Sequence, residues 1–347
     1  MKQPIVIAGP CSAESREQVL STAEALASGG IRIFRAGVWK PRTRPGGFEG
    51  VGSIAFQWLQ EARERTGMQV CTEVATPQHV EEVLKAGMDL LWIGARTTAN
   101  PFAVQELAVA LKGTEVPVLV KNPINPDIEL WCGAVERLRG EGIRQIGLIH
   151  RGFSAYERDL YRNIPLWHIP IEMKRRYPEI QLFCDPSHMG GRRELVAPLA
   201  QQALDLMYDG LFIESHCNPD CALSDAQQQL TPADLLSLLQ SLSVRENGSL
   251  PADIASLRGQ IDEIDAELLR LLSRRQQLSE EIGNYKVRNN MPVLQSARYR
   301  EMIEKRTELA SHLGLDASYV TSIMETIHKE SIRRQLELVA DAEKGNA

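Results

Sequence analysis

The segment MQVCTEVATPQHVEEVLKAGMDLLWIGAR, residues 68–96, decides the fold because it contains one complete strand, helix and strand unit. Its outer runs, MQVCTEV at 68–74 and DLLWIGA at 89–95, are short and mostly apolar, and a stretch of helical length separates them. The same rhythm repeats from residue 5 to about residue 240. Six further runs share this character: IVIA (5–8), IRIFRA (31–36), PVLVKN (117–122), QIGLIHR (145–151), QLFCD (181–185) and GLFIE (210–214).

The eight runs predict eight parallel strands. Runs that are apolar along their whole length are typical of strands buried on both faces, as in parallel sheets. Eight strand and helix units in about 240 residues match an α/β fold of the (β/α)8 type, also called a TIM barrel. A doubly wound sheet is the alternative.

The pattern changes after SVRENGSLPA, residues 243–252, where apolar periodicity stops and turn-forming residues cluster as in a linker. We therefore expect a barrel domain over residues 1–242, a linker over 243–252 and a separate all-α domain over 253–347. Three helical stretches are expected in the last domain: 253–288, 296–312 and 316–341.

The composition excludes several classes of protein. Among 347 residues, 39 lysines and arginines face 45 aspartates and glutamates, a net charge of −6 that argues against a nucleic-acid partner. The N-terminal residues lack the apolar core of a signal peptide, and no run of 18 apolar residues occurs, so we expect a cytoplasmic protein without membrane association. Six dispersed cysteines without a C-x-x-C pair are expected to be free thiols or metal ligands.

Cationic side chains recur where the predicted strands end. Active sites of such barrels are built at the carboxyl ends of the strands. A surface position would explain any one of these cations, but their repetition at corresponding strand ends predicts a strongly anionic ligand, with phosphate and carboxylate as the natural partners. The five residues are Arg35, Lys40, Arg96, Lys121 and Arg151.

A candidate metal site follows from the same reasoning. Cys11, His188 and Glu214 follow the first, seventh and eighth runs, which become neighbours when the barrel closes, and Asp225 comes in the next loop. Thiolate, imidazole and carboxylates suit a divalent transition metal such as manganese, iron, cobalt or zinc. The alternative is a small buried thiol, a loop-capping histidine and a strand-end charge.

Seven motifs occur in the barrel domain: AGPCSAES (8–15), FRAGVWKPRT (34–43), IGAR (93–96), VKNP (120–123), HRG (150–152), DPSHMGGRREL (185–195) and ALSDAQQQL (222–230). In their order and spacing they resemble the type I 3-deoxy-D-arabino-heptulosonate 7-phosphate (DAHP) synthases, specifically the β subgroup. A sister family, the 3-deoxy-octulosonate 8-phosphate synthases, shares the barrel and the phosphoenolpyruvate site. Its loop reads K-A-N-R-S where this chain has KPRT at 40–43, which favours erythrose 4-phosphate over arabinose 5-phosphate as substrate.

The resemblance implies roles for individual residues. It implies that the five cations bind phosphoenolpyruvate with Glu73 nearby, and that Arg42 and Thr43 contact the aldose phosphate. We expect Lys40 to protonate the aldehyde oxygen and Glu73 to position the attacking water, with DAHP and phosphate as products. It implies one divalent ion, manganese first, with iron, cobalt or zinc as alternatives, held by Cys11, His188, Glu214 and Asp225.

The stretch at 253–288 predicts one long amphipathic helix. Position 275 of its apolar seam is arginine, and a buried arginine needs an anionic partner. Lys286 points to the same side as Arg275, whereas Arg258 lies about 100° away and would need another chain to join them. A helix of about 54 Å is too long for so small a module to bury alone, so we expect a homodimer through this helix, with higher oligomers open. A dimerising bundle without a binding site is the alternative.

LRGQIDEIDAELLRLLSRRQQLSEEIGNYK, residues 257–286, resembles the all-helical chorismate mutases, and the likeness continues to Gln335. It implies that chorismate rearranges to prephenate with Lys286 and Gln335 at the breaking ether oxygen, and with Arg275 and Arg258 of the partner subunit at the carboxylates. Gln295 and Tyr299 stand where the pattern often has aspartate and glutamate. The implied substrate contacts are Arg258, Arg275, Lys286, Arg298 and Gln335.

Regulation is expected to come from these helices. The β subgroup often carries an N-terminal regulatory domain, and the first predicted strand begins near residue 5, so feedback would act from the C-terminal end. We expect prephenate to inhibit the synthase. The alternative is that the helical domain is a non-catalytic sensor of chorismate or prephenate.

Overall fold

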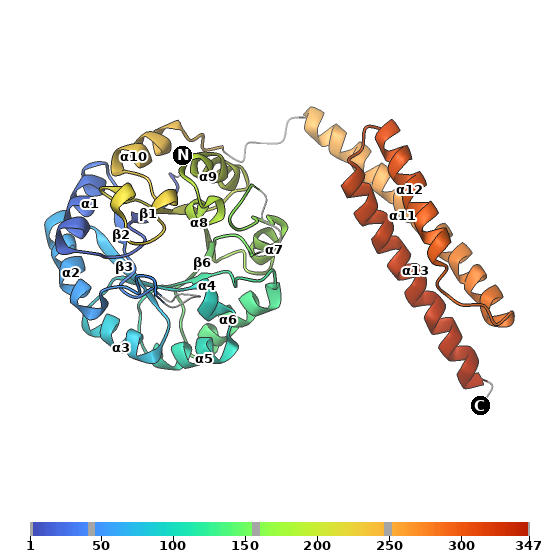
Figure 1. Ribbon diagram of the computed structural model, residues 1–347, viewed down its shortest axis with the longest axis horizontal. Helices are drawn as coiled ribbons and strands as arrows, with labels where there is room; N and C mark the ends of the chain where they lie inside the picture. The colour runs from blue at the N-terminus through green and yellow to red at the C-terminus, as the bar shows by residue number, and fades with distance from the viewer. Residues whose placement is uncertain (1–2, 41–45, 155–159, 246–251, 346–347) are drawn as a thin grey trace. The chain divides into compact units, whose positions relative to one another are not determined.

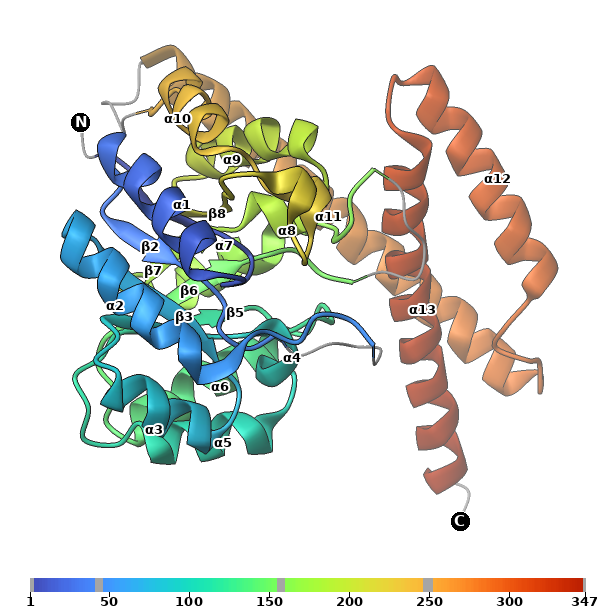
Figure 2. The same ribbon diagram turned by 60° about the vertical axis from the view of Figure 1, so that its left-hand side comes forward.

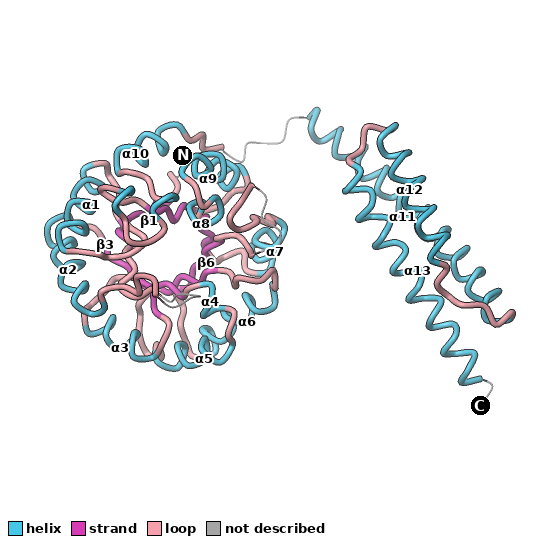
Figure 3. The backbone as a smooth tube through the Cα atoms, in the orientation of Figure 1, coloured by secondary structure: helices cyan, strands magenta, loops and turns pink. Residues whose placement is uncertain are grey.

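The computed structural model describes residues 3–40, 46–154, 160–245 and 252–345. The chain divides into two compact units, Met1–Glu246 and Asn247–Ala347. Figures 1 and 3 show the first unit as a ring of helices around a closed sheet, and the second as long helices joined by short connections.

Eight parallel strands close the first unit into a barrel in the order β1 to β8. The first strand pairs with the second on one side and with the eighth on the other, where Ile7 lies opposite Phe212. This closure confirms the predicted (β/α)8 barrel and excludes the open doubly wound sheet. The strands are β1 (Ile5–Gly9), β2 (Ile33–Arg35), β3 (Gln69–Val74), β4 (Leu90–Ile93), β5 (Val118–Lys121), β6 (Ile146–His150), β7 (Gln181–Cys184) and β8 (Gly210–Glu214).

Helices cover the outside of the barrel (Figure 2). Several begin at a side-chain cap: Ser15, Thr76 and Asp127 each accept a hydrogen bond from a backbone N–H of the helix that follows. The α-helices are α1 (Arg16–Ser28), α2 (Ala55–Thr66), α3 (Pro77–Lys85), α4 (Ala95–Thr98), α5 (Pro101–Ala110), α6 (Ile128–Gly140), α7 (His168–Arg176), α8 (Pro186–Gly190), α9 (Val196–Asp205) and α10 (Pro232–Ser241). Short 3-10 helices are η1 (Gly52–Ile54), η2 (Arg193–Leu195), η3 (Pro219–Cys221) and η4 (Ala226–Gln228).

Two apolar clusters form the core of the barrel. The larger one packs the outer helices against the sheet, and the smaller one gathers strand residues such as Ile7, Trp92 and Phe212 in the barrel interior. The guanidinium of Arg35 lies 4.9 Å from the centre of the Trp92 ring and 4.4 Å from that of Phe212. A buried cation therefore rests on the aromatic part of the interior.

The second unit consists of α11 (Ala252–Arg288), α12 (Ser296–His312) and α13 (Ala317–Gly345), close to the three predicted helical stretches. Apolar residues along α11 stay exposed in the single chain, among them Leu257 (58%), Ile261 (56%) and Leu268 (52%). A row of half-exposed leucine and isoleucine side chains is typical of a face that another surface covers. Among the described residues, no helix combines the length and the apolar character that crossing a bilayer requires.

Replacing Gly9 by alanine is expected to destabilise the barrel. Gly9 ends β1 with a φ of +150°, and an added β carbon would lie 2.1 Å from the carbonyl oxygen of Arg35 on β2. We expect a loss of about 2 to 5 kcal/mol, measured by urea unfolding, because β1 and β2 must separate. Gly30→Ala is the control, since Gly30 also has a positive φ but nothing lies within 4 Å of its added β carbon. Equal losses in the two variants would contradict the steric explanation.

Candidate functional sites

The carboxyl ends of the strands surround a polar cavity at one mouth of the barrel. Arg35 does not line it; this arginine is 1% exposed, and its Nη2 donates to Glu214 Oε1 at 3.2 Å. Arg42 and Thr43 lie outside the described residues. The lining includes Glu73 and four of the five predicted cations: Lys40, Arg96, Lys121 and Arg151.

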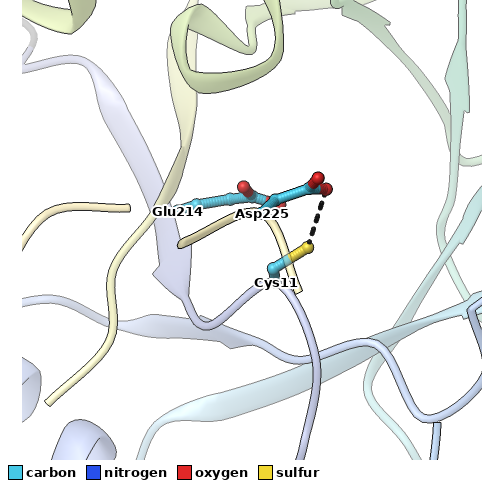
Figure 4. A group of neighbouring side chains, drawn as sticks. All are labelled: Cys11, Glu214 and Asp225. Carbon is cyan, nitrogen blue, oxygen red and sulfur yellow. Dashed lines mark hydrogen bonds between the residues drawn. The ribbon is translucent and has the colours of Figure 1, made fainter. Parts of the chain in front are cut away.

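The four residues predicted to bind a metal lie together at this mouth. One atom each of Cys11, Glu214 and Asp225 lies within 4.8 Å of the others, and the Cys11 thiol donates to Asp225 Oδ2 at 3.3 Å (Figure 4). His188 is not part of that group of three, but its Nε2 lies 3.8 Å from Glu214 Oε1. Its Nδ1 lies 2.8 Å from Asp185 Oδ2, so the Asp185 carboxylate lies beside the ring nitrogen that does not face Glu214.

This donor set fits a divalent first-row transition metal. It combines one sulfur, one imidazole nitrogen and two carboxylates, which is a mixture of soft and hard ligands. Burial, together with the nearby charge of Glu214, raises the pKa of the Cys11 thiol to about 12. The thiolate therefore needs added positive charge beside it, and a bound divalent ion would supply that charge.

Lys40 reaches the same donors from the segment after β2. Its ammonium donates a hydrogen bond to Cys11 Sγ and lies 3.5 Å from Asp225 Oδ2. Burial disfavours the charged form, but Cys11, Glu214 and Asp225 outweigh burial and raise the pKa of Lys40. Lys40 is therefore a protonated donor at the border between the predicted metal ligands and the cavity.

Polar partners hold two other cations of the cavity in place. Lys121 Nζ donates to Asp185 Oδ2 at 2.9 Å, and Arg151 Nη1 donates to Asn163 Oδ1 at 2.7 Å. Burial lowers the pKa of both groups, that of Arg151 to about 10. An anionic ligand in the cavity would offset the cost of burying them.

Glu73 is fixed by its neighbours on β4. Its carboxylate accepts a hydrogen bond from Trp92 Nε1 at 3.0 Å. A β carbon at Gly94 would lie 2.2 Å from Glu73 Oε1, so only glycine leaves room for the carboxylate. The carboxylate is thus held at the cavity wall that Glu73 and Gly94 share.

Four side chains of this site had no predicted role: Asp185, Asn163, Arg162 and Gln228. Asp185 is the last residue of the seventh run and directly follows β7, so the strand-end rule gave a signal that could have identified it. Arg162 and Asn163 lie well beyond the end of β6, where that rule gives none. Arg162 lines the cavity, and Gln228 is 1% exposed in η4.

A second cavity, of about 490 Å³, lies among α11, α12 and α13. Lys286 Nζ donates to Gln335 Oε1 at 3.1 Å, and Arg275 Nη1 donates to Ser331 Oγ at 2.8 Å. Arg258 is exposed and is not among the residues that line it in this chain. Its described lining contains no aspartate or glutamate but four cations: Arg275, Lys286, Arg298 and Arg306.

The two residues that depart from the mutase pattern, Gln295 and Tyr299, also line this cavity. The ring of Tyr299 stacks on His328, with 4.5 Å between the ring centres. Burial and the charges of Arg275 and Lys286 lower the pKa of His328, which favours its neutral form. A stacked pair of aromatic rings, one of them the neutral imidazole of His328, therefore forms part of the cavity wall. Neither Arg306 nor His328 had a predicted role.

Both units match known families. The sequence model of the DAHP synthetase I family matches residues 2–246, and that of chorismate mutase type II matches residues 257–336. The chain therefore belongs to the DAHP synthetase I family and carries a chorismate mutase type II region after the barrel.

Curated relatives and solved structures agree with this placement. A phospho-2-dehydro-3-deoxyheptonate aldolase of Thermotoga maritima is 35% identical over 225 residues, which cover 65% of this chain and 64% of that protein, just under two thirds of its length. A 2-dehydro-3-deoxyphosphooctonate aldolase of Nitratidesulfovibrio vulgaris is 31% identical and covers 69% of this chain and 90% of its own. The crystal structure of the Thermotoga maritima DAHP synthase superposes with a TM-score of 0.63 at 33% identity, covering 69% of this chain and 68% of its own.

Proposed function

We propose that the barrel condenses phosphoenolpyruvate with erythrose 4-phosphate in a metal-dependent reaction that gives DAHP and phosphate. The observation that supports this most directly is a cation-lined cavity beside a sulfur, nitrogen and oxygen donor set. Two phosphorylated anions repel each other in water, and the cations offset that repulsion while they fix the reacting carbons. We assign this activity to residues 1–242, the linker to 243–252 and the second activity to 253–347.

The chain's own residues divide the work of this reaction. Lys40 donates a proton to the oxygen that becomes an alkoxide as the carbon bond forms, and Glu73 orients the water that adds to carbon 2 of phosphoenolpyruvate. Arg35 holds Glu214, while Arg42 and Thr43 bind the aldose phosphate. The cavity cations that bind phosphoenolpyruvate are Lys40, Arg96, Lys121 and Arg151.

A divalent ion, with manganese first and iron, cobalt or zinc as alternatives, would bind to Cys11, His188, Glu214 and Asp225. When bound, it supplies Lewis acidity at the aldehyde oxygen. Asp185 keeps the ring of His188 in the orientation that this role requires.

Arabinose 5-phosphate is the competing acceptor, because the octulosonate aldolases are also similar to this chain. We expect the full chain to consume phosphoenolpyruvate with erythrose 4-phosphate at least about tenfold faster than with arabinose 5-phosphate. We further expect EDTA to abolish the condensation, manganese to restore it, and the chorismate reaction to continue throughout, because the helical cavity contains none of the proposed metal ligands.

The condensation is measured with each acceptor as the loss of phosphoenolpyruvate absorbance. The rearrangement is measured in the same preparation as the loss of chorismate. Faster turnover of arabinose 5-phosphate would favour the octulosonate synthase. Equal loss of both reactions with EDTA would contradict separate sites.

We propose that the helical unit rearranges chorismate to prephenate. The cavity places Lys286 Nζ 3.1 Å from Gln335 Oε1 and is lined by further cations that suit a dicarboxylate. The rearrangement is a single pericyclic step, so catalysis consists of holding the reactive conformer and stabilising charge at the ether oxygen. Arg275 and Arg298 of the same chain bind a carboxylate of chorismate.

We further propose that two chains pair through α11, so that Arg258 of the partner subunit completes each cavity. The exposed apolar row on α11 and the exposure of Arg258 support this arrangement. A site shared between chains gives a symmetric dimer two equivalent active sites.

Mixing two inactive variants tests the shared site. Arg258→Ala and Lys286→Ala are each expected to lose at least about a hundredfold in chorismate turnover. After unfolding and refolding together, half of the dimers are mixed and each contains one intact site, so the mixture should recover about a quarter of the wild-type rate. Lys305→Ala, an exposed lysine paired with Glu301 on α12, is the control and should leave the rate unchanged.

Recovery no greater than the sum of the two separate variants would contradict a shared site. Chorismate binding by the wild type without turnover would instead favour a non-catalytic sensor.

We propose that prephenate inhibits the barrel reaction through the helical unit. This proposal is supported by the presence of both family regions in one chain. Saturating prephenate should lower the rate of phosphoenolpyruvate consumption at least about fivefold, and Lys286→Ala should remove that inhibition because it weakens prephenate binding. An unchanged rate with saturating prephenate in the wild-type chain would refute feedback.

A further inference from the structure

Each carboxylate of the proposed metal site has one oxygen turned toward the site and one turned away. Asp225 Oδ2 accepts from the Cys11 thiol at 3.3 Å and lies 3.5 Å from Lys40 Nζ. Glu214 Oε1 lies 3.2 Å from Arg35 Nη2 and 3.8 Å from His188 Nε2. The remaining oxygens, Asp225 Oδ1 and Glu214 Oε2, which we call the outer oxygens, have different hydrogen-bond partners.

Arg162 and Gln228 bind both of these outer oxygens. Arg162 Nη1 donates to Asp225 Oδ1 at 3.1 Å and to Gln228 Oε1 at 2.7 Å. Gln228 Nε2 donates in turn to Glu214 Oε2 at 2.6 Å. We call this pair the Arg162–Gln228 bracket, because a continuous set of hydrogen bonds runs from one carboxylate to the other through it.

The backbone at Asp225 adopts an uncommon conformation. Asp225 has a φ of +48° and a ψ of 38°, in the left-handed region that residues other than glycine seldom occupy. Such a conformation persists where the surroundings over-determine it. Here Gln228, three residues further on, donates its backbone N–H to the carbonyl of Asp225 at 3.2 Å.

Charge explains why an arginine suits this position. Glu214 and Asp225 are two carboxylates close together in a buried site, and their mutual repulsion disfavours having both ionised. Arg162 contacts Asp225 at Oδ1, whereas Cys11 and Lys40 contact it at Oδ2, so the guanidinium offsets that repulsion through a different oxygen. Arg162 also lines the substrate cavity, so one side chain contacts both the metal-binding carboxylates and the space for substrate.

We propose that the Arg162–Gln228 bracket positions Glu214 and Asp225 for metal binding by fixing the outer oxygen of each carboxylate, so that a single inner oxygen of each is presented to the ion. This proposal rests on the proposed metal-dependent function. It gives positioning roles to Arg162 and Gln228, which are not themselves proposed metal ligands. Outer hydrogen-bond partners of metal ligands typically change metal affinity by 10- to 100-fold when removed.

Cobalt(II) titration of the metal-free full-length chain tests the bracket without any assay of activity. Charge-transfer absorption between thiolate and cobalt reports on Cys11, and competition with a chelator gives the affinity. We expect Arg162→Leu and Gln228→Leu each to bind cobalt about 10- to 100-fold more weakly than the wild type. Gln227→Leu is the matched control, because Gln227 is an exposed neighbour in the same 3-10 turn, and its affinity should stay within about twofold.

The folding of the variants is controlled in two ways. The Arg162 side chain is 43% exposed, so its truncation leaves the core intact even if the buried change at Gln228 does not. Thermal unfolding of each metal-free variant is measured in parallel. Lowered stability of Arg162→Leu with unchanged cobalt affinity would overturn the proposal and leave the bracket a purely structural contact.

The failure of the bracket is distinguishable from the failure of the metal site. If the wild type binds cobalt and both bracket variants match Gln227→Leu, the bracket alone is overturned. If Cys11→Ser binds cobalt as tightly as the wild type, the assignment of the metal ligands is wrong, and the proposal for the Arg162–Gln228 bracket is wrong as well.

Discussion

Hydrogen bonding between β1 and β8 closes the barrel, and the chemistry at its mouth depends on that closure. Gly9 pairs with Glu214 in the register of these two strands, so Cys11, two residues beyond Gly9, arrives beside the Glu214 carboxylate. Ser187 Oγ, just after β7, accepts a hydrogen bond from the backbone N–H of Glu214 at 3.0 Å, which ties the neighbouring strand end to the same point. Residues from opposite ends of the barrel sequence therefore share one small volume only because the sheet has no free edge.

Paired charges are the second constraint on this mouth. Arg35 contacts Glu214, Lys40 contacts Asp225, and Lys121 contacts Asp185, and all three contacts involve well-buried groups. A buried charge without a partner costs several kcal/mol. The carboxylates that would bind a metal, or support its ligands, therefore also stabilise the buried cations by pairing with them. The cations are thereby fixed before an anionic ligand enters, and little reorganisation is needed when it does.

The site residues at strand ends could be predicted from the sequence, whereas a residue in a long connecting segment could not. Apolar runs locate parallel strands, and the residues at the end of each run lie at the mouth, so Lys121 and Arg151 could be placed from sequence. Arg162 could not, because its position depends on the path of the segment after β6 and not on any strand end.

In the helical unit, periodicity along α11 places Arg275 and Lys286 on one face, since both belong to the same continuous helix. His328 reaches the cavity from α13, and Arg306 from α12, so their presence depends on how separate helices pack. That packing leaves no periodic signal within any one segment. Residues that line the cavity can therefore be predicted when they lie on one helix. They cannot be predicted when their position depends on the packing of several helices.

If the closed barrel brings Cys11, His188, Glu214 and Asp225 to a single ion beside a cationic cavity, that ion can be located by anomalous diffraction at the manganese edge, from crystals of the full chain grown with manganese and phosphoenolpyruvate. We expect one strong peak at about 2.0 to 2.6 Å from an atom of each of these residues, with the phosphoenolpyruvate phosphate against the cavity cations. A peak elsewhere, or none at this position with phosphoenolpyruvate bound, would contradict this placement of the ion.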